Sequence, residues 1–120
     1  MEYNHEVIFC IINEGFSETV MDAARRAGAR GGTVLRARGT ANLDAEKFFG
    51  ISISPQKEIV MILVPSDIRN DVLHNLYSTC GLDTPGHGIA FALPVDSVIG
   101  LKTAPAAEAP ETEETNKSGN

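Results

Sequence analysis

The chain has 120 residues, 42% of them hydrophobic, and a formal net charge of −6. This length and composition predict one globular domain with a modest core. The acidic charge argues against a general nucleic-acid-binding protein. The absence of a membrane-length apolar run and of a signal peptide predicts a cytoplasmic protein.

Hydrophobic periodicity divides the chain into strands and helices. Nearly unbroken β-branched and apolar runs predict strands, whereas apolar residues at three- and four-residue spacing, such as Phe16, Val20 and Ala24, predict helices with one buried face. Ser66 is a favourable N-cap for the second helix. The expected elements, in order, are a strand over 5–12, a helix over 16–27, strands over 32–38 and 57–64, a helix from Ser66 to Gly81, a strand over 89–95 and a short extra strand over 97–102.

The order β-α-β-β-α-β is typical of ferredoxin-like domains. We therefore predict an α+β fold in which two helices cover one face of a four-stranded antiparallel sheet. The strands over 7–12 and 59–64 are apolar on both faces, so the second face needs a cover that this short chain cannot supply. This pattern predicts an obligate homo-oligomer.

Two segments lie outside the predicted core. Residues 39–56 form a mostly polar excursion between the second and third strands. Residues 104–120 contain four Glu, one Lys and almost no bulky apolar side chain, so burial cannot offset the entropy cost of ordering them. We expect a folded domain over 1–103 and a disordered acidic tail over 104–120.

The cysteines and histidines give no metal-binding pattern. Cys10 and Cys80 lie in apolar segments, and we expect both to be free thiols in a reducing compartment. His5 and His74 have no Cys or carboxylate at ligand spacing, so no metal site is predicted.

Glycine-rich segments over 28–34 and 83–88 each precede a strand. A backbone without Cβ atoms can turn sharply and present its N–H groups to an anion. Two such segments indicate a phosphate-bearing ligand, although glycines before strands also form ordinary turns. Arg36 and Arg38 alternate along the second strand and share one face; they either reach a ligand or partner, or form surface ion pairs with Asp44, Glu46 or an adjacent subunit.

Taken in order, these segments resemble the PII signalling proteins, specifically the PII-like branch. The resemblance covers residues 5–103 and rests on the segments Gly31–Leu35, Phe48–Ile51, Lys57–Val60 and Gly81–Leu101. It implies a non-enzymatic, ferredoxin-like homotrimer that binds an adenine nucleotide (AMP, ADP or ATP) in the clefts between subunits. It also implies a protein target, such as a membrane transporter or a metabolic enzyme, that is regulated through a T-loop over 39–54.

The resemblance implies roles for individual residues. The segment 84–88 looks like the phosphate-binding B-loop of the family, and Lys102 matches a C-terminal basic ligand from the neighbouring subunit. Phe48 and Phe49 either contact the partner or anchor the base of the T-loop. The candidate nucleotide-binding residues are Thr33, Leu35, Arg36, Arg38, Thr84, Pro85, Gly86, His87, Gly88, Ile89 and Lys102.

The sequence also departs from the family pattern. Ile89 replaces a phosphate-binding lysine and Gly100 a second basic residue, so AMP, ADP or a cyclic dinucleotide is as well supported as ATP. The T-loop lacks the tyrosine needed for uridylylation, and residues 39–42 lack the glutamine of 2-oxoglutarate sensors. Two alternatives stay open: an oligomeric adaptor that has lost nucleotide binding, and a small hydrolase using Cys80 or His87 with Asp83, for which no second base or oxyanion motif is evident.

Overall fold

The computed structural model describes residues 3–40, 56–82 and 87–101. The order of its elements confirms the predicted order of strands and helices. They are β1 (His5–Asn13), α1 (Ser17–Arg26), β2 (Thr33–Arg38), β3 (Gln56–Pro65), the 3₁₀ turn η1 (Ser66–Ile68), α3 (Arg69–Thr79) and β4 (Gly88–Val95).

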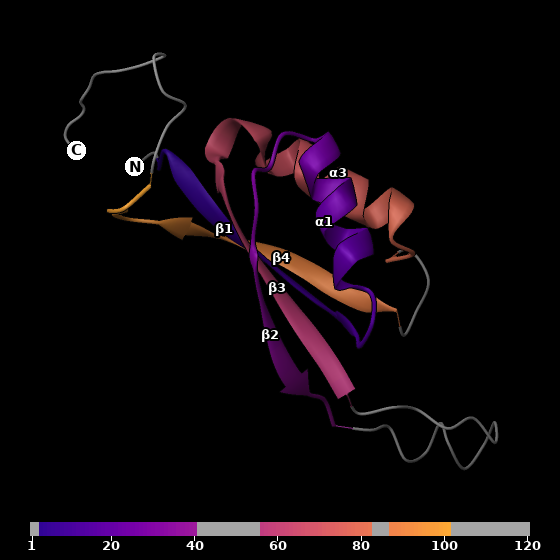
Figure 1. Ribbon diagram of the computed structural model, residues 1–120. Coiled ribbons are helices and arrows are strands. Elements are labelled where there is room, and N and C mark those ends of the chain that lie inside the picture. The colour runs from indigo at the N-terminus through magenta and orange to yellow at the C-terminus, as the bar shows by residue number, and fades with distance from the viewer. Residues whose placement is uncertain (1–2, 41–55, 83–86, 102–120) are drawn as a thin grey trace, which may run out of the picture.

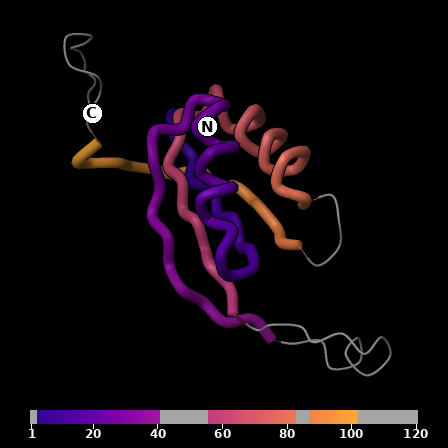
Figure 2. Tube along the Cα trace, turned by 45° about the vertical axis from the view of Figure 1, so that its right-hand side comes forward, coloured from indigo at the N-terminus to yellow at the C-terminus, as the bar shows by residue number. Residues whose placement is uncertain are grey.

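The four strands form one antiparallel sheet in the order β2-β3-β1-β4. Both helices lie on the same face of this sheet and pack against each other, as Figures 1 and 2 show from two directions. This arrangement confirms the predicted ferredoxin-like α+β fold. The predicted T-loop and acidic tail fall almost entirely outside the described residues, so the domain boundaries stay a prediction.

The core lies between the sheet and the two helices. On β1, every second side chain from Ile8 to Ile12 is buried, because alternate residues of a strand face the same side. The same alternation buries Val60, Ile62 and Val64 on β3. The helices contribute a stripe at three- and four-residue spacing to the same core: Val20, Met21, Ala23 and Ala24 from α1, and Val72 and Leu76 from α3.

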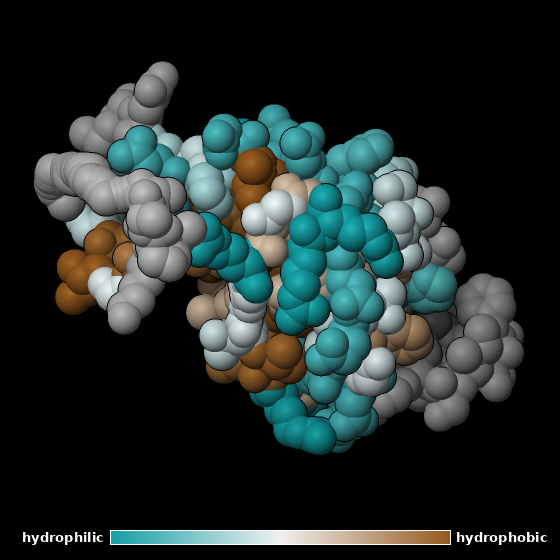
Figure 3. Space-filling model, turned by 45° about the horizontal axis from the view of Figure 1, so that its top comes forward, coloured by the Kyte–Doolittle hydropathy of each residue, from teal (hydrophilic) through white to brown (hydrophobic). Residues whose placement is uncertain are grey.

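The opposite face of the sheet, here called the uncovered face, is apolar, and no other element of the described residues covers it. Its central pair is Phe9 on β1 and Phe91 on β4, whose rings stack with centroids 5.5 Å apart. Figure 3, which is turned toward the top of the molecule in Figure 1, shows a mostly hydrophilic surface with small groups of hydrophobic side chains. The exposed large hydrophobic residues of this face are Leu35 (42%), Ile89 (58%), Phe91 (41%) and Leu93 (47%).

Three local predictions were wrong. Phe16 does not join the buried face of α1 but is 55% exposed just before the helix begins. The Ser66 hydroxyl does not cap α3; it donates instead to the carbonyl oxygen of Tyr3, so the 3₁₀ turn η1 precedes the helix. Residues 97–101 form no strand, and Ile99 is 97% exposed.

Candidate functional site

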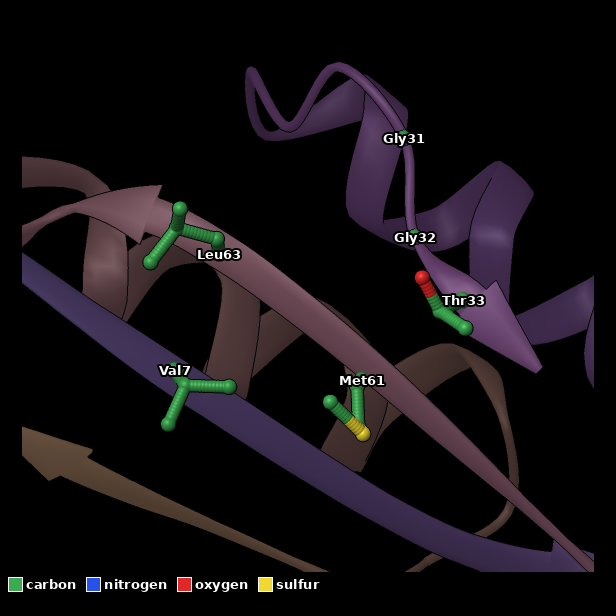
Figure 4. Close-up of a pocket in the computed structure, with 6 residues that line it drawn as sticks. All are labelled: Val7, Gly31, Gly32, Thr33, Met61 and Leu63. Carbon is green, nitrogen blue, oxygen red and sulfur yellow. The ribbon is translucent and has the colours of Figure 1, made fainter. Parts of the chain in front are cut away.

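A cavity of about 280 Å³ opens beside the segment that enters β2. Figure 4 shows Gly31, Gly32 and Thr33 along this segment, next to the strands β1 and β3 that carry the other lining side chains. These side chains are Val7 from β1 and Met61 and Leu63 from β3. All three project from the uncovered face, because they alternate with the buried core residues.

The cavity suits a flat, uncharged group. None of the six residues that line it carries a charge, and Thr33 supplies a hydroxyl that can donate or accept one hydrogen bond. Drug-sized ligands occupy pockets of roughly 300–1,000 Å³ that are mostly apolar with a few polar groups. At about 280 Å³ the cavity can hold a ring system such as a nucleobase, but not a whole nucleotide.

Gly32 lets β2 approach β3 closely. A Cβ atom at this position would lie 2.8 Å from the carbonyl oxygen of Met61 and 2.9 Å from Sδ of Met21. At Gly31, a Cβ atom would meet nothing within 4 Å. The close approach at Gly32 therefore sets the position of the cavity wall and explains why only glycine fits there.

The predicted residues of β2 divide between the two faces of the sheet. Thr33 and Leu35 lie on the uncovered face, and Thr33 lines the cavity. Arg36 and Arg38 share the opposite, helix-side face, where Arg36 Nη1 forms an ion pair with Glu14 Oε2 at 2.7 Å. The ion-pair alternative therefore applies to Arg36, with Glu14 as its described partner. Asp44 and Glu46 lie outside the described residues.

The described end of the predicted B-loop lies on the other edge of the sheet. Gly88 begins β4 with φ +145°, and a Cβ atom there would lie 2.5 Å from the carbonyl oxygen of Ile11. His87 Nδ1 lies 3.2 Å from the carbonyl oxygen of Gly81, within hydrogen-bonding distance. Ile89 is 58% exposed on the uncovered face.

The two halves of the predicted site do not meet within one subunit. Thr33 on β2 is level with Phe9, whereas Gly88 on β4 is level with Ile12. The strand order places three strand spacings between the two edges, which is about 14 Å across the sheet, with about 10 Å more along the strands.

Four predicted nucleotide-binding residues and both predicted partner-contact residues lie outside the described residues. They are Thr84, Pro85, Gly86, Lys102, Phe48 and Phe49, together with Asp83 of the hydrolase alternative.

A second cavity, of about 120 Å³, is lined by the two candidate catalytic residues of the hydrolase alternative, whereas its assisting Asp83 lies outside the described residues. Cys80 and His87 line it together with Ile12, Asn13, Phe16, Thr19 and Val20. Burial raises the pKa of the Cys80 thiol, although the Thr79 hydroxyl and Arg26 oppose this. A protonated thiol is a poor nucleophile, and the contact of His87 is with the Gly81 carbonyl. This geometry gives the hydrolase alternative no support.

Cys10 provides a pH-dependence prediction. Both cysteines are free, and burial raises the pKa of the fully buried Cys10 thiol from 9.0 to about 12, with a smaller contribution from Cys80. Above pH 9 the unfolded chain therefore loses a proton that the folded chain keeps, so stability falls as pH rises. Between about pH 8 and pH 10.5, urea unfolding should show the wild type losing about 2 kcal/mol more stability than Cys10→Ala. Parallel curves for the two proteins would contradict this prediction.

Two further properties concern only the residues that the structure describes. Within residues 3–40, 56–82 and 87–101, no three His, Cys, Asp or Glu side chains are grouped so that they could hold a metal ion. Over the same part of the chain, neither α1 nor α3 has the length and hydropathy needed to cross a bilayer.

Reasoning from the sequence missed most of the cavity. It identified Thr33 and the glycines before it, but not Val7, Met61 and Leu63. The signal was present, because these three residues occupy the alternate positions of two strands that are apolar on both faces. What was lacking was the strand order, which places β3 between β1 and β2.

Comparisons of sequence and of structure give different results. No family model matches the sequence, and no curated protein matches it. Among solved structures, PII from Arabidopsis thaliana bound to citrate is similar with 26% identity and a TM-score of 0.63, over 82% of this chain and 83% of that one.

Two further solved structures share the fold. CPII from Thiomonas intermedia, bound to ADP, AMP and acetate, is 15% identical with a TM-score of 0.59, over 78% of this chain and 87% of that one. A protein from Thermus thermophilus described as PII-like is 18% identical with a TM-score of 0.57, over 79% of this chain and 90% of that one.

Proposed function

We propose, on the premise that this chain is a relative of the PII superfamily, that it is a PII-like signalling protein that responds to an adenine nucleotide. Its structural likeness to PII and PII-like proteins supports that premise. The nucleotide binds in clefts between the subunits of a homotrimer. The bound protein then regulates a protein target, such as a membrane transporter or a metabolic enzyme, through the loop over 39–54.

This proposal rests on the positions of two half-sites, the neutral cavity beside Thr33 and the glycine segment at His87–Gly88. They lie on opposite edges of one sheet. A ligand that needs an apolar pocket for its base and amides for its phosphates finds both only where the β2 edge of one subunit meets the β4 edge of another. The uncovered apolar face supplies a reason for subunits to meet.

The chemistry of each half-site matches one part of a nucleotide. Val7, Met61 and Leu63 offer an apolar wall for a base, and the Thr33 hydroxyl can select a ring with a hydrogen-bonding edge. Glycines occupy positions 86 and 88, and segments of this type favour phosphate binding through backbone N–H groups. Of the solved relatives, the Thiomonas protein is bound to ADP and AMP.

The adaptor alternative keeps specific support. Ile89 stands where the family places a lysine, and the described residues lining the cavity bring no positive charge to it. Each lost charge-assisted hydrogen bond weakens phosphate binding by roughly 1.5–3 kcal/mol. We therefore expect ATP to bind less than about tenfold more tightly than ADP, because Ile89 and Gly100 stand where the family has basic residues that bind phosphate.

Calorimetric titration with AMP, ADP, ATP and cyclic di-AMP tests the proposal. We expect saturable binding of at least one nucleotide, near one ligand per subunit. Thr33→Val keeps the shape of the side chain and removes its hydroxyl, so affinity should fall about two- to tenfold, the value of one hydrogen bond. Thr79→Val, at an exposed position on α3 that lines neither cavity, is the matched control and should bind like the wild type. No binding across the panel by a folded, assembled protein would favour the adaptor.

A further inference from the structure

The turn between β1 and α1 makes an unusual set of polar contacts. The Asn13 Oδ1 atom accepts a hydrogen bond from Lys57 Nζ at 2.6 Å, and Glu14 Oε2 pairs with Arg36 Nη1 at 2.7 Å. The backbone N–H of Gly15 donates to Glu58 Oε1 at 3.2 Å. The backbone N–H of Glu14 donates to the carbonyl oxygen of Gln56 at 3.3 Å. Three consecutive residues thus contact two other strands.

These contacts reach both faces of the sheet. Asn13 and Lys57 are paired in register on the uncovered face, where their side chains meet. Glu58 faces the helix side, like its register partner Arg36. The turn therefore holds the start of β3 from both faces and extends past it to β2.

The contacts lie at the two strand ends that flank residues 41–55. Arg36 and Gln56 stand near the end of β2 and at the start of β3, the two strand ends between which residues 41–55 run. Among the described strands, β2 lies at the edge of the sheet and pairs with β3 alone. Outside that pairing, the ion pair from Arg36 to Glu14 joins the end of β2 to the turn after β1.

We propose that residues Asn13–Gly15 form a clamp that sets the geometry of the two strand ends carrying the 41–55 segment. Within the clamp, the Glu14–Arg36 pair is the releasable member. Its side chains are 43% and 79% exposed, so water and salt weaken it, whereas the contact between Lys57 and Asn13 is partly buried. The clamp requires neither a nucleotide nor a partner, so it goes beyond the proposed function.

The clamp also adjoins the smaller cavity. Asn13 and His87, which belongs to the candidate phosphate-binding segment, both line that cavity. The turn thus lies between the phosphate-binding segment and the strand ends that carry the predicted T-loop. A change in the cavity can reach Asn13, and a change at the strand ends can reach Asn13, Glu14 and Gly15.

Hydrogen exchange of the ligand-free, full-length protein tests the clamp. Glu14→Lys replaces the ion pair with a repulsion, so the amides of residues 36–40 should exchange about two- to fivefold faster, the range expected for one exposed pair. The amide of Leu76 in α3 should be unchanged. The double variant Glu14→Lys, Arg36→Glu restores the pair with reversed charges. Made in a Glu58→Gln background, so that no like charge faces position 36 on β3, it should return the rates to within about a factor of two of that background.

Asp96→Lys is the matched control, because it makes the same charge change at an exposed carboxylate after β4 that has no described contact with the clamp. Unchanged rates at residues 36–40 in Glu14→Lys would overturn the proposal. So would an equal acceleration in α3, which indicates global destabilisation, or a double variant as fast as the single one. No nucleotide is present in this experiment, so its failure is distinct from a failure of nucleotide binding.

Discussion

Phe91→Asp is expected to convert the proposed homotrimer into monomers. Light scattering should then report 12.8 kDa per particle instead of a multiple of that mass. Phe91 is 41% exposed in the single subunit and stacks on Phe9 at the centre of the uncovered face. A carboxylate there stays hydrated in a monomer but would be buried without a partner in an oligomer, which costs several kcal/mol per ion.

The apolar character of this face makes the effect large. Ile89, Leu93 and Leu35 belong to the same patch, and monomeric proteins rarely expose continuous apolar patches above a few hundred Å². Symmetry also repeats the substitution in every subunit. Because Phe91 is half-exposed in the subunit, the loss of its core contacts is small, and circular dichroism should show a folded chain.

Tyr77→Asp controls for the loss of an exposed aromatic residue. Tyr77 is 57% exposed on α3, on the helix layer, and its substitution should leave the assembly intact. Phe91→Asp should also lose nucleotide binding, although Phe91 does not line the cavity, because the two half-sites would no longer meet. A folded Phe91→Asp protein with the wild-type mass would show that another face forms the interface.

Gly32→Ala is expected to lower the free energy of unfolding by about 1–3 kcal/mol, the range for overpacked sites. The added methyl group would lie 2.8 Å from the Met61 carbonyl oxygen, which is backbone and can move only with β3. Either β2 shifts outward or β3 shifts with it. Each movement changes the wall of the cavity, so nucleotide affinity should fall together with stability.

The neighbouring Gly31→Ala is a close control. It adds the same methyl group one residue earlier, where no atom lies within 4 Å, and neither position has a left-handed backbone. Its stability should stay within about 0.5 kcal/mol of the wild type or rise slightly, because alanine restricts the unfolded chain. Urea unfolding of the two variants measures the difference. Equal stabilities would show that β2 does not need this close approach.

The secondary structure was largely predictable because local rules decide it. Unbroken runs such as that over 5–12 favour a strand through their β-branched and apolar residues, and the spacing of Val20, Ala23 and Ala24 favours a helix. The errors occurred where a distant contact competed with a local preference. Ser66 is a favourable N-cap by type, but the Tyr3 carbonyl, 63 residues away in the chain, takes its hydroxyl.

The candidate site was predictable only in part. A glycine segment before a strand can be recognised from the sequence, and it identified Thr33 as a candidate site residue. Val7, Met61 and Leu63 are ordinary apolar strand residues, and strand order alone makes them one wall. Likewise, Glu14 was not recognised as the partner of Arg36, because 22 residues separate them and the turn after β1 meets β2 only across β3.

The sequence by itself determined the elements, their order and the excess of apolar residues on both sides of the central strands, because these depend on local propensity and on a two-residue period. The tertiary structure decided which residues meet. Strand pairing placed Thr33 and Gly88 on opposite edges, turned Arg36 away from the cavity, and brought the turn over residues 13–15 against the ends of β2 and β3. Register and strand order depend on contacts between distant segments, which one-dimensional periodicity does not encode.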